Sequence, residues 1–340
     1  MVMMKSLVCL EPTKMVYQQR NKPSPAPHEA LIKIKNVGIC GTDIHAWAGR
    51  QPFFSYPRVL GHEICGEVVA TGAQVERLLP GQQVSVIPYV ACQQCPACLS
   101  GRSNCCENIS VIGVHQDGGF CEYLCVPAAN LLPADDLDPE AAALIEPFAI
   151  SAHAVRRAAI ADGDDVLVVG AGPIGLGVAA IARADGARVA VADTSATRRD
   201  HVRQHLALPV LDPGQHDFEL RLRQCFSGAL AQKLVDATGN QAAMNNTVNL
   251  IRHGGSITLV GLFKGDLQFS DPEFHKKETT LLGSRNATPQ DFVRVAQLMA
   301  AGRLTAGMLL THRYAFDALA DVYQRDVIDN RQLIKGVIQF

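Results

Sequence analysis

The sequence predicts an α/β protein with two domains, one mostly β and one built on a doubly wound parallel sheet. Its 340 residues are more than one hydrophobic core usually holds. Short β-rich runs separated by Gly, Pro and Asp fill the first part, and strands alternate with helices from about Asp162 onward. A glycine-rich turn joins the first strand and helix of that alternation.

Composition excludes several classes of protein. Hydrophobic residues make up 48% of the chain and charged residues 19%, and the net charge of -2 gives no electrostatic case for a nucleic-acid or membrane partner. The longest apolar stretch, Val166–Ala182, is interrupted by glycines, and the first ten residues lack the apolar core of a signal peptide. We therefore expect a cytoplasmic protein whose 11 cysteines are metal ligands or buried thiols rather than disulfides.

The β-rich part is expected to form a mostly antiparallel domain. Its strand-like runs are Ala30–Val37, Glu67–Thr71 and Gln83–Ile87. After about Arg285 the chain becomes helical and ends in a short strand, Leu333–Phe340.

The alternating part predicts a parallel sheet with helices on both faces. Its first strand, Val166–Val169, precedes an Ala- and Gly-rich helix, Pro173–Asp185. The other strands are predicted at Arg188–Asp193, Lys233–Asp236, Ser256–Gly261 and Thr279–Gly283.

The turn between the first strand and helix has the spacing of a dinucleotide-binding site, as in a Rossmann domain. Gly170 permits the tight turn, Gly172 lets the backbone approach a pyrophosphate, and Gly175 lets the helix pack close to the strand. Pro173 and Ile174 begin the helix, whose N-terminal amides would face the phosphates. The alternative is a structural turn that binds nothing, but the strand, the helix and the acid described next complete the pattern.

That acid ends the second strand of the sheet. Asp193 is placed to accept hydrogen bonds from the adenosine ribose hydroxyls and to repel a 2′-phosphate, which favours NAD over NADP. Arg198, on the helix that follows, could instead accept a phosphate, or it is a solvated helix residue or an adenine contact.

Four cysteines close in sequence predict a structural zinc site. Cys92, Cys95, Cys98 and Cys106 have the spacing of a closed tetrahedral thiolate shell. Cys105 could replace its neighbour, and a redox switch is the rival interpretation.

A second set of donors predicts a catalytic zinc. Cys40, His62 and Glu146 offer soft, borderline and hard donors from separated segments, and such a site keeps a position open for water or a substrate oxygen. Glu63 could hold the metal-bound water or enter the coordination shell transiently. Spacing alone makes this set only suggestive, since a lone Cys or His is more often a core residue.

Taken together, these motifs resemble the zinc-containing medium-chain dehydrogenases. The runs that carry the resemblance are Gly38–Asp43, Gly61–Glu63, the four-cysteine loop, Asp117–Phe120 and Val169–Gly175, which span nearly the whole chain in the family's order. Ile145–Pro147 resembles the polyol branch, which has a glutamate where other alcohol dehydrogenases have a cysteine. Within that branch, Thr42–Trp47 and Gln51–Glu63 look like bacterial hexonate 5-dehydrogenases, which oxidise a secondary alcohol of a sugar acid to a ketone.

The resemblance implies a domain plan and an assembly. A GroES-like catalytic domain would comprise residues 1–150 and 287–340, interrupted by an NAD-binding Rossmann domain at residues 151–286. It also implies a small-molecule substrate, one catalytic and one structural zinc per chain, and a homodimer or homotetramer.

Roles for single residues follow from the same resemblance. Thr42 and His45 are expected to relay the proton of a zinc-bound alcohol, with ordinary structural roles as the alternative. A hexonate carboxylate needs a cationic partner, for which Arg285, Lys264 and His115 are the candidates. The alternative is a threonine or simple polyol dehydrogenase, and a simple polyol, which has no carboxylate, would need no such partner. A nicotinamide-sensing scaffold would not need an open metal site.

Overall fold

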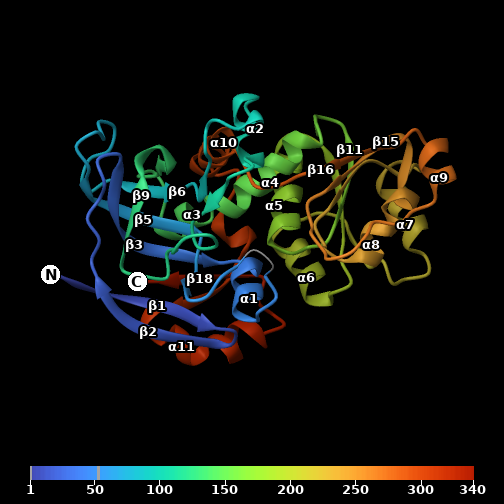
Figure 1. The fold of residues 1–340 in the computed structure, drawn as a ribbon. Coiled ribbons are helices and arrows are strands. Elements are labelled where there is room, and N and C mark those ends of the chain that lie inside the picture. Colours follow the sequence, from blue (N-terminus) through green and yellow to red (C-terminus); the bar gives the residue numbers. More distant parts are fainter. Residues whose placement is uncertain (1, 52–53) are drawn as a thin grey trace. The chain divides into compact units, whose positions relative to one another are not determined.

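The computed structural model describes residues 2–51 and 54–340, and the chain divides into two compact units. The first unit comprises Met1–Glu146, Thr288–Ala306 and Leu310–Phe340, and the second comprises Pro147–Ala287 and Gly307–Leu309. Figure 1 labels the helices and strands of both units. The predicted fold class, a mostly β domain plus a doubly wound parallel sheet, is confirmed.

The main sheet of the first unit has the order β10-β6-β5-β3-β18-β17, with β9 also pairing with β3. Its neighbouring strands are antiparallel except for the parallel pair β17 and β18. The strands are β3 (Glu29–Ile39), β5 (Glu63–Thr71), β6 (Gln83–Val86), β9 (Tyr123–Pro127), β10 (Leu131–Pro133), β17 (Leu310–Ala315) and β18 (Lys335–Gln339).

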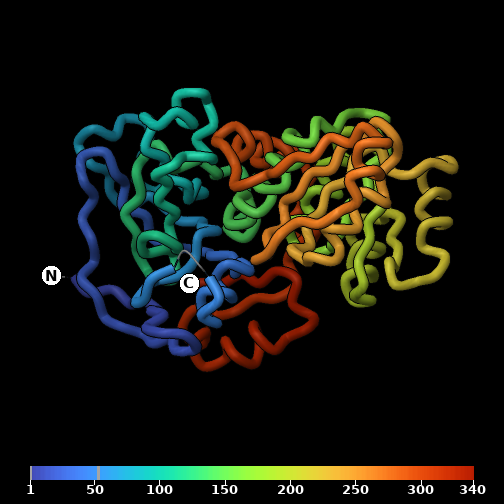
Figure 2. The backbone as a smooth tube through the Cα atoms, turned by 45° about the vertical axis from the view of Figure 1, so that its right-hand side comes forward, coloured from blue at the N-terminus to red at the C-terminus, as the bar shows by residue number. Residues whose placement is uncertain are grey.

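The C-terminal strand completes this sheet. In β18, Gly336 pairs with Ile39 of β3, so strands nearly 300 residues apart in the chain lie side by side in one sheet. Figure 2 shows the red C-terminal segment beside the blue N-terminal strands of the same unit. The expected strand at Leu333–Phe340 is therefore present, whereas β17 was not predicted because its run, LTHRYA, is too polar to indicate a strand.

Smaller elements surround this sheet. The strands outside it are β1 (Met3–Glu11), β2 (Lys14–Asn21), β4 (Arg58–Val59), β7 (Tyr89–Val90) and β8 (Ser110–Val111). The helices are α1 (Gly41–Trp47), α2 (Pro96–Leu99), α3 (Pro139–Ala143), α10 (Pro289–Ala300) and α11 (Leu319–Val322). The core includes Leu7, Ile32, Ile64 and Phe120, all fully buried, and it fixes the ends of β3 and β5 where the site lies.

The second unit is a six-stranded parallel sheet in the order β13-β12-β11-β14-β15-β16. Because β11 comes first in the chain and lies in the middle, the sheet grows outward in both directions, which creates a switch point between β11 and β14. The strands are β11 (Asp165–Val169), β12 (Arg188–Ala192), β13 (Val210–Leu211), β14 (Ala231–Asp236), β15 (Ile251–Leu259) and β16 (Thr280–Gly283).

Helices connect these strands. They are α4 (Ile145–Arg157), α5 (Pro173–Ala184), α6 (Ala196–His201), α7 (Phe218–Cys225), α8 (Gln241–Asn246) and α9 (Asp271–Lys276). Helix α5 contacts β11, β12 and β14, as expected for a crossover helix that covers the sheet. Among the described residues, no helix has the length and apolar character needed to cross a membrane.

Candidate active site

Two strand ends bring together the donors that the sequence predicts for a catalytic zinc. Strand β3 ends at Ile39 and the antiparallel β5 begins at Glu63, so Cys40 and His62 leave the sheet side by side. The donor atoms of Cys40, His62 and Glu63 lie within 4.8 Å of one another, and His62 and Glu63 are buried. This close grouping has the donors and dimensions of a metal site.

The carboxylate of Asp43 fixes the two segments relative to each other. Its Oδ2 accepts a hydrogen bond of 2.9 Å from the Cys40 amide, and its Oδ1 accepts one of 3.1 Å from the Gly61 amide. Oδ1 also lies 3.7 Å from Nδ1 of His62. Burial raises the pKa of Asp43, but these amides and His62 oppose that shift by favouring the carboxylate.

The set is suited to a cation. Nδ1 of His62 and Oε2 of Glu63 are buried and have no hydrogen-bond partner among the described residues. Burial alone would lower the pKa of His62, but the negative charges of Cys40 and Asp43 outweigh it and raise that pKa well above its ordinary value. Thiolate, imidazole and carboxylate are the donors that zinc takes, so these residues fit a zinc ion.

Lys335, which the sequence analysis missed, lies against this set. Its Nζ donates to Oε1 of Glu63 at 2.5 Å and to the carbonyl oxygen of Ile39 at 3.1 Å, and the side chain is 2% exposed. Burial lowers the pKa of Lys335, but Glu63 and Cys40 outweigh it and raise it overall. A lysine inside the otherwise apolar run Ile334–Ile338 was the signal that could have revealed it.

Glu146 lies beside the set but is not part of the group of three. It occupies the first turn of α4, is buried, and accepts a hydrogen bond at Oε1 from the hydroxyl of Tyr89. Burial raises the pKa of its carboxyl to about 7, against the opposing charge of His62. The structure therefore brings Cys40, His62 and Glu63 together and holds Glu146 at their edge.

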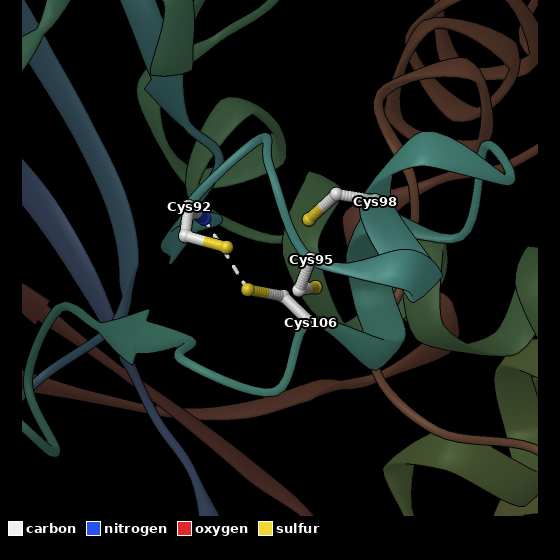
Figure 3. A group of neighbouring side chains, drawn as sticks. All are labelled: Cys92, Cys95, Cys98 and Cys106. Carbon is white, nitrogen blue, oxygen red and sulfur yellow. Dashed lines mark hydrogen bonds between the residues drawn. The ribbon is translucent and has the colours of Figure 1, made fainter.

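The four cysteines of the loop before β8 point their sulfur atoms toward one another, as Figure 3 shows. The sulfurs of Cys92, Cys95, Cys98 and Cys106 lie within 4.8 Å of one another. Backbone amides lower the pKa of Cys92 to about 6, whereas burial and neighbouring thiols raise that of Cys98 to about 12. Four thiol sulfurs grouped this closely fit the closed tetrahedral shell of a structural zinc site. Cys105 is exposed and is not in the group.

The glycine turn of the second unit has the geometry that its spacing predicts. Gly170 has φ +96°, which a residue with a side chain rarely adopts, and a Cβ at Gly175 would lie 1.8 Å from the carbonyl oxygen of Gly170. Pro173 and Ile174 begin α5, with Gly172 as the residue that caps it. The N-terminal amides of α5 therefore open at the switch point of the sheet.

Asp193 follows β12 at the same edge of the sheet. Its Oδ2 accepts from the amide of Ala171 and its Oδ1 from that of Ser195, both at 2.7 Å. Arg198 is partly exposed, with Nη1 3.7 Å from Oδ2 of Asp193. The carboxylate is thus locked beside the glycine turn, with an arginine next to it.

Comparisons with known proteins identify the family. Residues 26–136 match the alcohol dehydrogenase GroES-like domain, and residues 173–301 match the zinc-binding dehydrogenase domain. L-galactonate-5-dehydrogenase of Escherichia coli K12 is 72% identical over 99% of both chains. This chain belongs to the zinc-binding alcohol dehydrogenases.

Solved structures of other dehydrogenases share the fold. The alcohol dehydrogenase RspB of E. coli CFT073, solved with NADH, has a TM-score of 0.92 at 30% identity, covering 99% of both chains. L-idonate 5-dehydrogenase of E. coli K-12 has a TM-score of 0.88 at 25% identity, covering 100% of this chain and 99% of that one. The chain is therefore an oxidoreductase of the zinc-dependent, nicotinamide-linked type that acts on alcohols.

The remaining predicted residues of this dehydrogenase lie at separate positions. Thr42, partly buried, and His45, exposed, are on α1, directly after Cys40. Arg285 and Lys264 are exposed and follow the carboxyl ends of β16 and β15 in the second unit. His115 is an exposed residue of the first unit, and its Nδ1 accepts a hydrogen bond from the Val111 amide.

Proposed function

We propose that this dehydrogenase oxidises a secondary alcohol of a sugar acid to a ketone with NAD, acting on the C5 hydroxyl of L-galactonate or a related hexonate. The observation that carries the proposal is the Cys40–His62–Glu63 set, in which one buried imidazole nitrogen and one buried carboxylate oxygen have no hydrogen-bond partner among the described residues. The identity of 72% to a hexonate dehydrogenase supports the choice of substrate.

Two zinc ions per chain are part of this proposal. Cys40, His62 and Glu63, with Glu146 beside them, would hold the catalytic ion, and the four cysteines of the loop would hold a structural one. A zinc ion bound by Cys40, His62 and Glu63 would supply Lewis acidity, which lowers the pKa of a bound alcohol. Residues 1–150 and 287–340 are assigned to the catalytic domain and residues 151–286 to the NAD-binding domain.

Thr42 and His45 are proposed as the route by which the alcohol's proton leaves. They are separated by one helical turn on α1, so their side chains lie on the same face of the helix. Thr42 is partly buried, two residues after Cys40, and His45 is exposed. Although His45 is exposed, partial loss of solvent around its ring, with a smaller contribution from Arg50, lowers its pKa, so the imidazole is neutral near pH 7 and can accept a proton.

Asp193 is proposed to select NAD. Its carboxylate is held by two amides, so it cannot turn away from a ribose bound at the glycine turn. It would accept hydrogen bonds from the ribose hydroxyls and repel a 2′-phosphate. Gly170, Gly172, Pro173, Ile174 and Gly175 would cradle the pyrophosphate, with Arg198 at the adenosine side.

Arg285 is proposed as the partner of the hexonate carboxylate. It follows β16, and the parallel register places the end of that strand on the same edge as the glycine turn. A planar guanidinium can bind a carboxylate through two hydrogen bonds, which Lys264 and His115 cannot do. We also propose a homodimer or homotetramer, which light scattering of the purified protein would test.

The experiment that tests the function is NADH formation with purified protein and a panel of substrates. The panel comprises L-galactonate, L-gulonate, L-idonate, D-gluconate, sorbitol and L-threonine. Turnover confined to hexonates supports the proposal, and Arg285→Lys should then raise KM for the hexonate more than it lowers kcat. Turnover on sorbitol alone would keep the metal chemistry but refute a role for Arg285 in binding a carboxylate. Turnover on L-threonine alone, which also carries a carboxylate, would refute the hexonate as substrate.

A further inference from the structure

Tyr89 is a residue of the site for which the proposed function gives no role. Its hydroxyl donates to Oε1 of Glu146, although it comes from β7, outside the sheet that positions Cys40 and His62. A phenol O–H can only be the donor to a carboxylate oxygen.

Three contacts hold Tyr89, two of them at its backbone and one at its ring. Tyr89 pairs with Val111 of β8 across a two-stranded hairpin. The side-chain amide of Asn130 donates to the Tyr89 carbonyl oxygen at 3.1 Å. The ring packs edge-on against Phe292 of α10, with 6.2 Å between centroids. These contacts restrict the rotation of the Tyr89 side chain, so its hydroxyl is a hydrogen-bond donor at a fixed position beside the Glu146 carboxylate.

The hairpin that carries Tyr89 also encloses the four-cysteine loop. Cys92 follows β7 and Cys106 precedes β8, so the loop between the paired strands contains all four thiols. A zinc ion bound by the four thiols would close that loop and hold the two strands in register. The cysteine cluster is therefore connected through β7 to the carboxylate of Glu146.

The hydrogen bond from Tyr89 determines where the Glu146 carboxylate lies. Cys40, His62 and Glu63 offer donor atoms within 4.8 Å of one another, and Glu146 is not in that group. If Oε1 lost its donor, a buried carboxylate would be left without that partner, and the nearest cation would attract it. A fourth protein ligand would close the position that a catalytic zinc keeps open.

We propose that Tyr89 is a positioning residue that holds Glu146 outside the Cys40–His62–Glu63 ligand set, so that the metal keeps its open position. The inference rests on the proposed function, because it takes this set as the catalytic zinc site. Glu146 would then remain available to accept a hydrogen bond at the open position rather than bind the metal itself.

The test is the visible spectrum of the full chain with cobalt(II) in the catalytic site, because the ligand-field bands of cobalt report the number and type of ligands. Tyr89→Phe keeps the ring that packs on Phe292 and removes only the hydroxyl. We expect the bands to shift, and kcat to fall by about tenfold to a hundredfold, the loss typical of one hydrogen bond to a charged group. KM should change less than kcat.

Two controls separate positioning from a structural role. Tyr17→Phe removes a hydroxyl that donates to the Phe316 carbonyl in the same unit, and it should leave the cobalt spectrum unchanged. In a Glu146→Ala background, Tyr89→Phe should also leave the spectrum unchanged, because the residue through which it acts is gone. If Tyr89→Phe does not fold, Asn130→Ala should cause a smaller shift in the same direction.

The cobalt spectrum requires neither NAD nor substrate, so it separates this inference from the proposed function. A shift in Tyr89→Phe supports the inference even if no hexonate is oxidised. An unchanged spectrum, or a shift that persists in the Glu146→Ala background, overturns it even if hexonates are good substrates. A lower melting temperature with an unchanged spectrum would make Tyr89 a structural residue only.

Discussion

Gly38 and Glu63 face each other across β3 and β5, and a methyl group on Gly38 would lie 1.9 Å from Oε2 of Glu63. That oxygen is the one without a hydrogen-bond partner, whereas Oε1 is held by Lys335. The glycine therefore leaves the space that the free carboxylate oxygen occupies. The position of the free carboxylate oxygen therefore depends on the residue opposite Glu63 on the neighbouring strand as well as on Glu63 itself.

Gly38→Ala should weaken metal binding at the catalytic set. The new methyl group must displace the Glu63 carboxylate, and disturbing the groups that orient a ligand typically costs about 10- to 100-fold in metal affinity. Competition with a chromophoric chelator would measure this loss. Gly283→Ala is the matched control, because a Cβ at Gly283 meets no atom within 4 Å. Equal affinities in the two variants would contradict the steric argument.

Lys335→Met should destabilise the protein, and more strongly after chelation. The variant leaves the buried carboxylate of Glu63 without its cation, which typically costs about 3–5 kcal/mol. A zinc ion beside Glu63 would replace part of that charge, so the fall in melting temperature should be smaller in zinc-loaded protein.

Lys35→Met is the control for that prediction. Lys35 pairs with Glu67 at 2.8 Å on the same two strands, but both side chains are about 40% exposed. A surface pair of this kind contributes about 0–1 kcal/mol, so Lys35→Met should melt close to the parent with or without zinc. The same loss for Lys335→Met in both metal states would show that zinc does not lie beside Glu63.

Cys40→Ser and Cys95→Ser should separate the two proposed zinc sites. Cys40→Ser should abolish turnover and remove one zinc per chain with little change in melting temperature. Cys95→Ser opens the closed thiolate shell and should lower the melting temperature more than it alters the chemistry. Cys105→Ser, at an exposed thiol outside the group, should resemble the parent in both respects. Lost activity with unchanged melting in Cys95→Ser would reverse the two assignments.

The sequence indicated local motifs better than long-range contacts. The turn at Gly170 and the four-cysteine loop were visible because each lies within a short segment, where spacing alone reflects geometry. Lys335 and Tyr89 could not be connected with the site, because their partners, Glu63 and Glu146, are far away in the chain. Only the packing of the sheets brings such residues together.

Strand boundaries show the same limit. β15 begins at Ile251, before the predicted Ser256, because His253, Gly254 and Gly255 interrupt the apolar run without ending the strand. The two-residue β13 was missed, since Val210–Leu211 is too short to show a period. Parallel pairing with β12 makes it a strand, and the sequence of that segment alone does not reveal its partner.

Asp193→Asn should shift cofactor preference toward NADP. The amide keeps the size of the side chain and an oxygen that can accept from Ala171 or Ser195, but it removes the charge that would repel a 2′-phosphate. Arg198, now 3.7 Å from that carboxylate, would become available to a phosphate. The ratio of kcat/KM for NAD to that for NADP should fall by about tenfold or more, equivalent to about 1.4 kcal/mol. Adding Arg198→Ala should remove the gain with NADP but leave the loss with NAD, whereas an unchanged ratio in Asp193→Asn would show that another residue selects the cofactor.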